Sequence, residues 1–432
     1  MSLNRLNSLK IDMQKCFRCH LCKMVPLPMV QHTTFTENCP INRYYQFHGY
    51  SGSGQQFMAL SLVDGRTEPS KDLADRVFSC RACGYCDVAC KFVMDAERHL
   101  VNMALREHLV ETGFAPKAHE EAMENLNKYG HADGKPKNQP GAWAEGLGLK
   151  VLPEEKAEVL LFAGCVQRNN PQSAGVSRKL AQLLLKAGVD VGILGDAEPC
   201  CGLPAYWRGY RETFTRMASE RAALFDGLGV KNIITACGAC LGMFRSKYDH
   251  YAIRPKTKAL HATEFLLELI KKRRLKLPKA IETKVTYHDP CYLGRQSEVI
   301  EKWEGVEKTV FGQMIYTDPP KKITFGTQGV YDAPREILKK IPGLQFNEMY
   351  RIREYALCCG AGGGVPKEYA DMARQTALHR LEEARDVGAE TLVTACSHCE
   401  GHFNEAQKGS EQESIRVVDI IDLVCEAAGI EA

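Results

Sequence analysis

After about residue 157, short apolar runs alternate with longer segments in which apolar residues recur at helical spacing. The short runs predict strands over residues 157–162, 232–236, 284–287 and 391–395. The longer segments predict helices over residues 174–186, 211–224, 366–384 and 417–427. Strands that alternate with helices are typical of βαβ units, which build parallel sheets. We therefore expect this part of the chain to be an α/β protein.

The chain before residue 157 has a different pattern. Residues 1–110 predict helical segments, and residues 111–156 contain Gly, Pro and Lys turns that indicate a connector. No apolar run approaches 18 residues, so the sequence predicts no membrane span. The N-terminus lacks the apolar core of a signal peptide, which favours the cytoplasm, with any membrane contact made through a partner.

Composition changes this picture through one residue type. The 432 residues are 44% hydrophobic and 25% charged, with a formal charge of only +3, and this balance gives no indication of nucleic-acid binding. The chain also contains 19 cysteines, and a cytosolic protein does not use so many for disulfides. The remaining interpretation is metal ligation by thiolates.

The cysteines fall into four groups that leave only Cys425 over, and Cys425 lies in an apolar segment as a small hydrophobe would. The first two groups contain C-x2-C-x2-C runs, and the last two contain a vicinal pair and a C-x2-C pair. The groups are Cys16, Cys19, Cys22 and Cys39; Cys80, Cys83, Cys86 and Cys90; Cys165, Cys200, Cys201, Cys237 and Cys240; Cys291, Cys358, Cys359, Cys396 and Cys399. So complete a use of cysteine indicates four metal sites.

The third and fourth groups belong to an internal repeat. Residues 232–244 parallel residues 391–403 at an offset of 159, and each copy has the order Cys, Cys-Cys-Gly, C-x2-C. In the second copy 66 residues separate Cys291 from Cys358, whereas 34 residues separate the corresponding cysteines of the first copy. We therefore expect an insertion in the second copy, near residues 296–329.

The two C-x2-C-x2-C runs resemble those of bacterial two-cluster ferredoxins, in which the fourth ligand of each [4Fe–4S] cluster comes from the other run. The resemblance implies that Cys90 completes the first run and that Cys39 completes the second. The sequence departs from this pattern at Lys91, where a proline is usual, and in the 16 residues between Cys22 and Cys39. Zinc is the alternative, but structural zinc favours separated cysteine pairs over a triple run.

The third and fourth groups are similar to the CCG cysteine-rich domains of heterodisulfide reductases. A ferredoxin region followed by two CCG domains is the arrangement of the D-type iron–sulfur subunit, which is related to iron–sulfur subunits of glycolate, lactate and glycerol-3-phosphate oxidation. The resemblance implies a helical two-cluster ferredoxin-like domain over residues 1–110 and two similar parallel-sheet CCG domains over residues 157–275 and 276–432. It also implies two cubane [4Fe–4S] clusters and one or two non-cubane [4Fe–4S] clusters, with zinc as an alternative in one CCG domain.

Several residues beside the CCG cysteines are candidates for a role in these sites. Gly202 and Gly360 follow the vicinal pairs, where the absence of a Cβ lets the backbone turn between two ligands. His288 could donate a proton or a hydrogen bond to a thiolate, or it could simply end a strand. His398 lies inside the second C-x2-C pair, where the first copy has Ala239, and is a candidate proton donor. This difference favours substrate chemistry at the second site alone.

Two local patterns add to the CCG interpretation. Each C-x2-C pair follows a predicted strand, and residues 241–249 could form a helix whose amide groups point at the cluster. The glycine run at residues 360–364 lacks the Lys-Ser/Thr of a phosphate-binding loop, so we expect it to approach a cluster or substrate closely instead.

The sequence contains no flavin or nicotinamide fingerprint of its own. We therefore expect an electron-transfer subunit of a multi-subunit redox complex with an FAD-containing flavoprotein partner, and an acyl-CoA reductase or dehydrogenase as a further candidate partner. The alternative is catalysis, in which the second CCG cluster reduces a disulfide. A third interpretation is a scaffold whose CCG sites hold zinc and carry no electrons.

Overall fold

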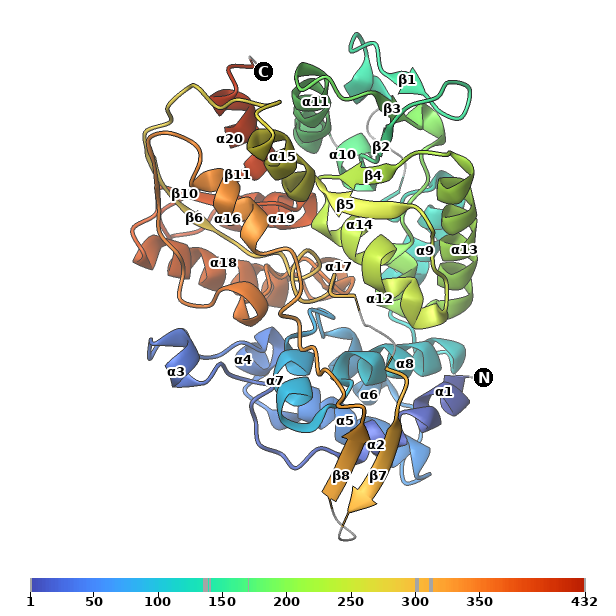
Figure 1. Ribbon diagram of the computed structural model, residues 1–432. Helices are drawn as coiled ribbons and strands as arrows, with labels where there is room; N and C mark the ends of the chain where they lie inside the picture. Colours follow the sequence, from blue (N-terminus) through green and yellow to red (C-terminus); the bar gives the residue numbers. More distant parts are fainter. Residues whose placement is uncertain are drawn as a thin grey trace.

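The computed structural model describes residues 2–134, 139, 141–169, 171–299, 303–310 and 314–430. Figure 1 shows a helical N-terminal domain below two α/β units that lie side by side. The first unit runs from β1 to α15 and the second from β6 to α20. The expected α/β architecture with parallel sheets and a helical N-terminal domain is confirmed.

The N-terminal domain is built from short helices around the first eight cysteines. Side-chain oxygens of Ser51 and Ser70 cap the N-termini of α5 and α6. Helix α8 is buried on most of its surface and packs against α1, α5 and α6, so it forms the centre of the domain. The helices are α1 Ser2–Ser8, α2 Lys10–Gln14, α3 Leu27–Val30, α4 Pro40–Tyr45, α5 Gly52–Val63, α6 Lys71–Phe78, α7 Tyr85–Met94, α8 Arg98–Glu111 and α9 Lys117–Tyr129.

The two units contain parallel sheets with the same strand order. The first sheet has the order β1-β3-β2-β4-β5, and the second, read from the matching edge, has the order β9-β6-β10-β11. The strands are β1 Lys150–Val151, β2 Val159–Leu161, β3 Val191–Ile193, β4 Asn232–Thr235, β5 Lys258–His261, β6 Thr283–Tyr287, β9 Leu344–Phe346, β10 Thr391–Thr394 and β11 Arg416–Asp419. The repeat seen in the sequence is therefore a repeat of fold, with β1 as an added edge strand.

Helices cover the sheets and join the two units. Helix α11 of the first unit packs against α20 of the second, and α15 packs against α16. The first unit contains α10 Cys165–Asn169, α11 Pro171–Lys186, α12 Leu203–Arg208, α13 Arg211–Gly227, α14 Gly238–Gly242 and α15 Ala262–Lys271. The second contains α16 Asp332–Leu338, α17 Val365–Glu368, α18 Ala370–Asp386, α19 Ser397–Gln407 and α20 Ile420–Ala427. In the described part of the chain, no helix is both long and apolar enough to cross a membrane.

Three expected elements differ from the structure. The helix expected over residues 417–427 begins as strand β11, because this segment pairs with β10, and Asp419 then caps α20 through the backbone N–H of Ile421. The helix expected over 366–384 breaks at Tyr369, which separates α17 from α18. The expected connector contains α9, whose buried His119, Met123 and Leu126 share one face. The domain limits at residues 110, 156 and 275 stay predictions.

The region of the expected insertion, of which residues 300–302 and 311–313 lie outside the described residues, contains an antiparallel hairpin. Its strands are β7 Val306–Val310 and β8 Met314–Asp318. The hairpin projects alongside the N-terminal domain in Figure 1. At its base, Lys321 forms an ion pair with Asp95, and Phe325 meets the ring of Phe92 edge to face.

The buried Arg106 of α8 joins the three regions. Its guanidinium donates to the carbonyl oxygens of Val77 and Cys80 in the N-terminal domain, of Trp207 in the first unit and of Gly363 in the second. A guanidinium has several donors and no acceptor, so one side chain can satisfy carbonyl groups from all three regions.

Candidate iron–sulfur sites

Four N-terminal cysteines line one small cavity. They are Cys16, Cys19, Cys22 and Cys90, which the ferredoxin resemblance assigns to one cluster. Cys19 is exposed in the loop after α2, and Cys90 lies in α7. Arg98, at the start of α8, lines the same cavity and hydrogen-bonds to Cys90. The structure brings this set together, and its assignment as a ligand set stays a prediction.

The other four N-terminal cysteines line a second cavity. Cys39 precedes α4, Cys86 lies in the first turn of α7, and Cys80 and Cys83 lie in the loop between α6 and α7. Burial raises the pKa of the Cys39, Cys80 and Cys86 thiols above the ordinary value. Such thiols are neutral near pH 7, and a metal that binds them displaces their protons.

Gly52 lies between these two sets. A Cβ atom at this position would lie 2.8 Å from the Cβ of Cys86 and 3.4 Å from the Cβ of Cys22. Cys22 also lines the second cavity. The backbone of α5 therefore passes between the two sets where a side chain would not fit, and this keeps the sets close together.

In the first unit, five thiols form a continuous hydrogen-bonded series. The order is Cys165, Cys200, Cys201, Cys240 and Cys237. These cysteines follow the carboxyl ends of β2, β3 and β4. Parallel sheets place ligand sites at that edge. The second unit repeats the arrangement with the series Cys291, Cys358, Cys359, Cys399 and Cys396.

The glycines after the vicinal pairs have the backbone conformation that favours glycine. Gly202 has φ +88° and Gly360 has φ +99°. A Cβ at Gly360 would also lie 2.7 Å from the carbonyl oxygen of Ala373. The two vicinal pairs therefore diverge from turns that a residue with a Cβ would strain.

Two thiol contacts join separate cysteine sets. Cys83 of the N-terminal domain hydrogen-bonds to Cys358 of the second unit. Cys237 of the first unit hydrogen-bonds to Cys396 of the second. Arg295 spans the first of these contacts, because its Nε donates to the carbonyl oxygen of Cys83 at 2.8 Å while its Nη1 donates to backbone carbonyls just before Cys358.

The donor sets fit iron–sulfur clusters. All 19 cysteines are free, and those of the four sets are buried or half-buried, except for Cys19. Thiolates are the ligands that iron–sulfur clusters take, and sets of five exceed the four ligands of a tetrahedral zinc site. The eighteen cysteines named from the sequence would therefore hold the clusters.

A cavity of about 700 Å³ lies between the two units. Cys165, Cys201, Cys237 and Cys240 of the first unit line it, and the second unit contributes His398. The His398 ring meets the ring of Trp207 edge to face, with centroids 5.7 Å apart. This cavity is open to the first cysteine set, whereas the sequence favoured substrate chemistry at the second.

His288 lies apart from that cavity, directly after β6. Its buried ring meets Phe403 edge to face, and one ring nitrogen lies within 4.8 Å of the sulfurs of Cys359 and Cys399. Burial and the nearby charge of Arg380 lower the pKa of His288 to about 3. The ring is therefore neutral near pH 7 and has no imidazolium proton to donate.

The glycine run after the second vicinal pair approaches backbone. A Cβ at Gly363 would lie 2.4 Å from the carbonyl oxygen of Cys80, and a Cβ at Gly362 would lie 2.6 Å from that of Arg81. We expected this run to approach a cluster or substrate. It instead lets the second unit close against a ligand loop of the N-terminal domain.

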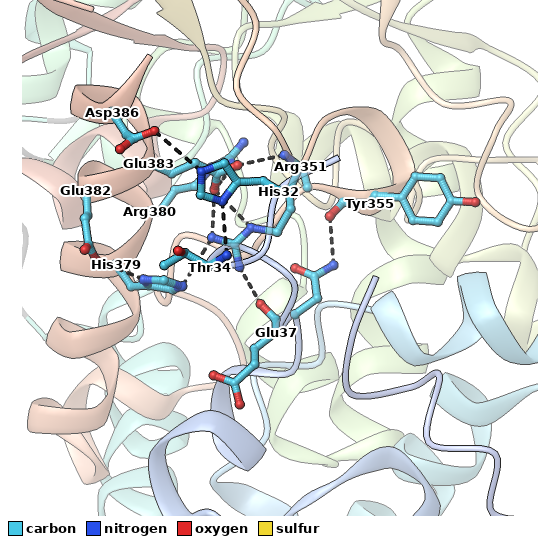
Figure 2. A network of polar contacts seen from close by, with 12 residues as sticks. His32, Thr34, Glu37, Arg351, Tyr355, His379, Arg380, Glu382, Glu383 and Asp386 are labelled. Atoms are coloured by element: carbon cyan, nitrogen blue, oxygen red, sulfur yellow. Dashed lines mark hydrogen bonds and ion pairs between the residues drawn. The ribbon is translucent and has the colours of Figure 1, made fainter. Parts of the chain in front are cut away.

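Figure 2 shows a polar network that connects the second unit to the N-terminal domain. Glu383 of α18 accepts hydrogen bonds from Arg351 at 2.7 Å and from Arg380 at 2.6 Å, and Arg351 also donates to the carbonyl oxygen of Glu37. Burial alone would raise the pKa of Glu383, but the two guanidinium groups lower it to about 2. The carboxylate is therefore ionised inside the protein.

Sequence reasoning missed the residues that surround the cysteines. Arg295, Arg380 and Trp207 reach the sites from other segments, and no local pattern marks them. The internal repeat carried one usable signal, because His288 lies three residues before Cys291 and Phe162 holds the same place before Cys165.

Comparison with known protein families agrees with this arrangement. Residues 12–93 match a family model described as a 4Fe-4S dicluster domain. Residues 159–245 and 324–404 match a model described as a cysteine-rich domain, CCG. A solved structure of a hypothetical protein from Helicobacter pylori resembles the fold, with a TM-score of 0.50, 10% sequence identity, and coverage of 88% of this chain and 68% of that one.

Curated relatives are similar over most of the chain. The D-type subunit of the dihydromethanophenazine:CoB–CoM heterodisulfide reductase of Methanosarcina mazei is 29% identical, with 98% of this chain and 95% of that protein covered. An EtfAB:quinone oxidoreductase of Syntrophomonas wolfei is 27% identical over 82% of this chain and 47% of its own length. The probable iron-sulfur-binding oxidoreductase FadF of Bacillus subtilis is 26% identical over 87% of this chain and 50% of its own length.

Fold, cysteine sets and family matches define an iron–sulfur oxidoreductase subunit with a 4Fe-4S dicluster domain and two CCG domains, which holds several [4Fe–4S] clusters. In particular, the chain is a homologue of the D-type subunit of heterodisulfide reductase.

Proposed function

We propose that this chain relays single electrons within a multi-subunit redox complex, between two ferredoxin-type cubane sites and the CCG sites. The contacts between the cysteine sets support this function, above all the hydrogen bonds from Cys83 to Cys358 and from Cys237 to Cys396. When bound, [4Fe–4S] clusters supply one-electron storage at potentials between roughly −700 and +450 mV. The residues of the chain fix the order and the surroundings of the sites.

The order of the sites in space differs from their order in the sequence. The set that contains the exposed Cys19 adjoins the set of Cys83 across Gly52. Cys83 contacts the second CCG unit, and only the second unit's C-x2-C pair contacts the first unit among the thiol contacts described. The relay we propose therefore runs from the surface of the N-terminal domain through the second CCG unit to the first.

A partner would exchange electrons at the exposed first set. Phe17 and Val93 line its cavity and are 57% and 38% exposed, and Lys15 and Arg18 lie beside them. The described residues that line this cavity include no carboxylate. An apolar centre with a basic rim fits a redox partner whose docking face is apolar and acidic.

The partner class that we propose is an FAD-containing flavoprotein, with an acyl-CoA reductase or dehydrogenase as a further member of the complex. The named relatives support assembly with other subunits, since one is named as a single subunit of a heterodisulfide reductase and another is an oxidoreductase named for EtfAB and quinone. The latter extends well beyond the region that this chain matches, so that region works beside additional polypeptide in that protein.

A second candidate function is catalytic reduction of a disulfide at a CCG site, and the cavity between the units favours it. Conversion of a disulfide to two thiols takes two electrons, which the relay would deliver singly, and two protons. His398 lines the cavity and would supply one of these protons. The second CCG site was the expected location, whereas the cavity meets the cysteines of the first.

Anaerobic affinity purification from the native source tests the relay, combined with iron, zinc and sulfide analysis and EPR during stepwise reduction. We expect about sixteen irons per chain, at least two separable cluster signals and a co-purified flavoprotein. Zinc with few irons would exclude electron transfer. Phe17→Glu should weaken partner binding, whereas Phe47→Glu, at an equally exposed phenylalanine that does not line this cavity, should not.

Turnover assays of the reduced chain with small disulfides test the catalytic function. His398→Ala should slow turnover, whereas His402→Ala should not, because the His402 ring lines the same cavity but is bound to the carbonyl oxygen of Ala373. If the reduced chain cleaves no disulfide, the chain is a relay and not a catalyst.

A further inference from the structure

His288 is fully buried, and its environment fixes the position of its proton. Nδ1 of the ring lies 3.3 Å from Nε of Arg380. A guanidinium group can only donate, so Nδ1 must accept and carries a lone pair. A neutral imidazole has one proton, which therefore lies on Nε2. Within the described residues, Nε2 has no hydrogen-bonding partner.

The guanidinium of Arg380 is held in place by a buried ion network, shown in Figure 2. Its Nη1 donates to Glu383 at 2.6 Å. Glu383 also accepts from Nη2 of Arg351 at 2.7 Å and from the backbone N–H of Arg351 at 2.7 Å. The side chains of Arg351, Arg380 and Glu383 have no exposed surface. The donor that faces His288 therefore has a fixed position.

The internal repeat supplies a natural comparison for His288. The backbone N–H of Phe162 donates to Ile234 at 2.8 Å, and that of His288 donates to Val393 at 2.8 Å. The Phe162 ring meets Phe244 edge to face at 5.1 Å between centroids, just as the His288 ring meets Phe403 at 4.9 Å. The two residues are therefore equivalent in backbone and in packing, and differ in the polar ring.

The arginine has an equivalent in the first unit as well. Arg221 of α13 corresponds to Arg380 of α18 at the repeat offset of 159. Its Nε donates to the carbonyl oxygen of Cys200 at 3.1 Å, whereas Nε of Arg380 donates to the ring of His288. The same helix position thus supports backbone in one unit and an imidazole in the other.

We propose that His288 donates an Nε2–H hydrogen bond to a cluster sulfur at Cys359 or Cys399, and that Arg380 is the positioning residue that sets this tautomer. One ring nitrogen already lies within 4.8 Å of both sulfurs. A protonated Nε2 cannot ligate iron, so His288 is a hydrogen-bond donor and not a sixth ligand of the site.

This inference rests on the proposed presence of a cluster at the second CCG unit. Donors to a ligating sulfur stabilise the more negative, reduced state of a cluster. The first unit has Phe162 in the same position and lacks this donor. With like clusters in the two units, the second site therefore has the more positive reduction potential, and an added electron settles there before the first site.

The substitution His288→Phe installs the residue that the first unit uses at this position, so the packing against Phe403 has a precedent within the same chain. Potentiometric EPR titration of the holoprotein should show the second CCG signal shifted to more negative potential. We expect a loss of about tenfold in the reduction equilibrium, which is about 59 mV for a one-electron couple. Iron content should not change.

Three further variants separate the donor from other effects. His288→Gln keeps an N–H donor and should retain most of the wild-type potential. Arg380→Met should shift the potential in the same direction as His288→Phe, whereas Arg221→Met in the first unit should leave the second signal in place. Proton ENDOR of the second signal should show an exchangeable coupling that His288→Phe removes.

The outcomes distinguish this inference from the proposed function. If the wild-type chain lacks iron at the second unit, the proposed function fails. If the cluster is present and His288→Phe moves neither its potential nor its ENDOR coupling, the donor assignment fails while the relay stands. Loss of the second cluster in His288→Phe but not in His288→Gln would make the residue a structural support and would overturn the tuning role.

Discussion

The thiols of Cys237 and Cys396 hydrogen-bond to each other across the boundary between the two CCG units. Each is the first cysteine of a C-x2-C pair, and each directly precedes a helix, α14 or α19. The two copies of the repeat therefore meet through equivalent residues. The ligand sets of the two units are neighbours for this reason, and bound clusters would be neighbours too.

Pairs of cysteine substitutions test the crossed ligand assignment in the N-terminal domain. Cys16→Ala should remove one cluster, about four irons per chain. Adding Cys90→Ala should remove no more iron, because both residues line the same cavity. Adding Cys39→Ala should remove about eight irons in total, since Cys39 lines the other cavity. Iron analysis of anaerobic protein measures this, with Cys425→Ala as the control.

The reverse pattern, with Cys39 redundant to Cys16 and Cys90 additive, would contradict the crossed assignment. The double variants are needed because single substitutions remove similar amounts of iron under either assignment.

Arg106→Met should destabilise the chain by roughly 3 to 5 kcal/mol. The substitution leaves the carbonyl oxygens of Val77, Cys80, Trp207 and Gly363 without this buried donor, and unsatisfied buried groups cost about 1 to 3 kcal/mol each. Urea unfolding of the holoprotein measures the loss. Arg216→Met, at a half-exposed arginine, should change stability by less than about 0.5 kcal/mol. Equal losses would show that Arg106 does not join the domains.

Gly360→Ala should be far more costly than Gly388→Ala. Both glycines have positive φ, at +99° and +72°, so both substitutions introduce backbone strain of about 1 to 2 kcal/mol. At Gly388 no atom lies within 4 Å of an added Cβ, whereas at Gly360 the Cβ would lie 2.7 Å from the carbonyl oxygen of Ala373. Urea unfolding should therefore separate the two variants. The same loss in both would mean that the close approach at Gly360 relaxes freely.

Stability should rise with pH above 7 because of Lys247. This side chain is buried with Ser246 as its nearest hydrogen-bonding partner, and burial lowers its pKa to about 7. Between pH 7 and the unfolded value of about 10.4, the unfolded chain binds a proton that the folded chain does not, so unfolding becomes harder as pH rises.

The expected gain from pH 7 to pH 9 is about 2 kcal/mol, measured as the free energy of unfolding in urea. Lys247→Met should remove this part of the pH dependence. Parallel profiles for the wild type and the variant would show that Lys247 does not titrate in this range.

The sequence was sufficient for the pattern of sites, because ligand chemistry imposes local spacing. The C-x2-C runs, the vicinal pairs and the offset of the repeat lie close together in the chain, and they predicted sets that the structure brings together. The strands around residues 160, 234, 285 and 393 were likewise predictable, since each is a short apolar run at the centre of a sheet.

The rest depended on contacts between distant segments. Strands β3 and β9 have three residues each, too few for a periodic pattern, and β11 was hidden in the apolar start of α20. The contact of Cys83 with Cys358 joins residues far apart in the chain, and so does the donation from Arg380 to His288. Local propensity carries no information about either.

The position of the second unit between the N-terminal domain and the first unit has a consequence for dissecting the chain. A fragment that stops before residue 276 would contain intact ligand sequences for three sites, yet it would lack both thiol contacts that bridge them. Its first unit would be stranded, reducible by small mediators but not by way of the N-terminal clusters. Gene truncation from the C-terminus should therefore uncouple the halves before it abolishes their colour.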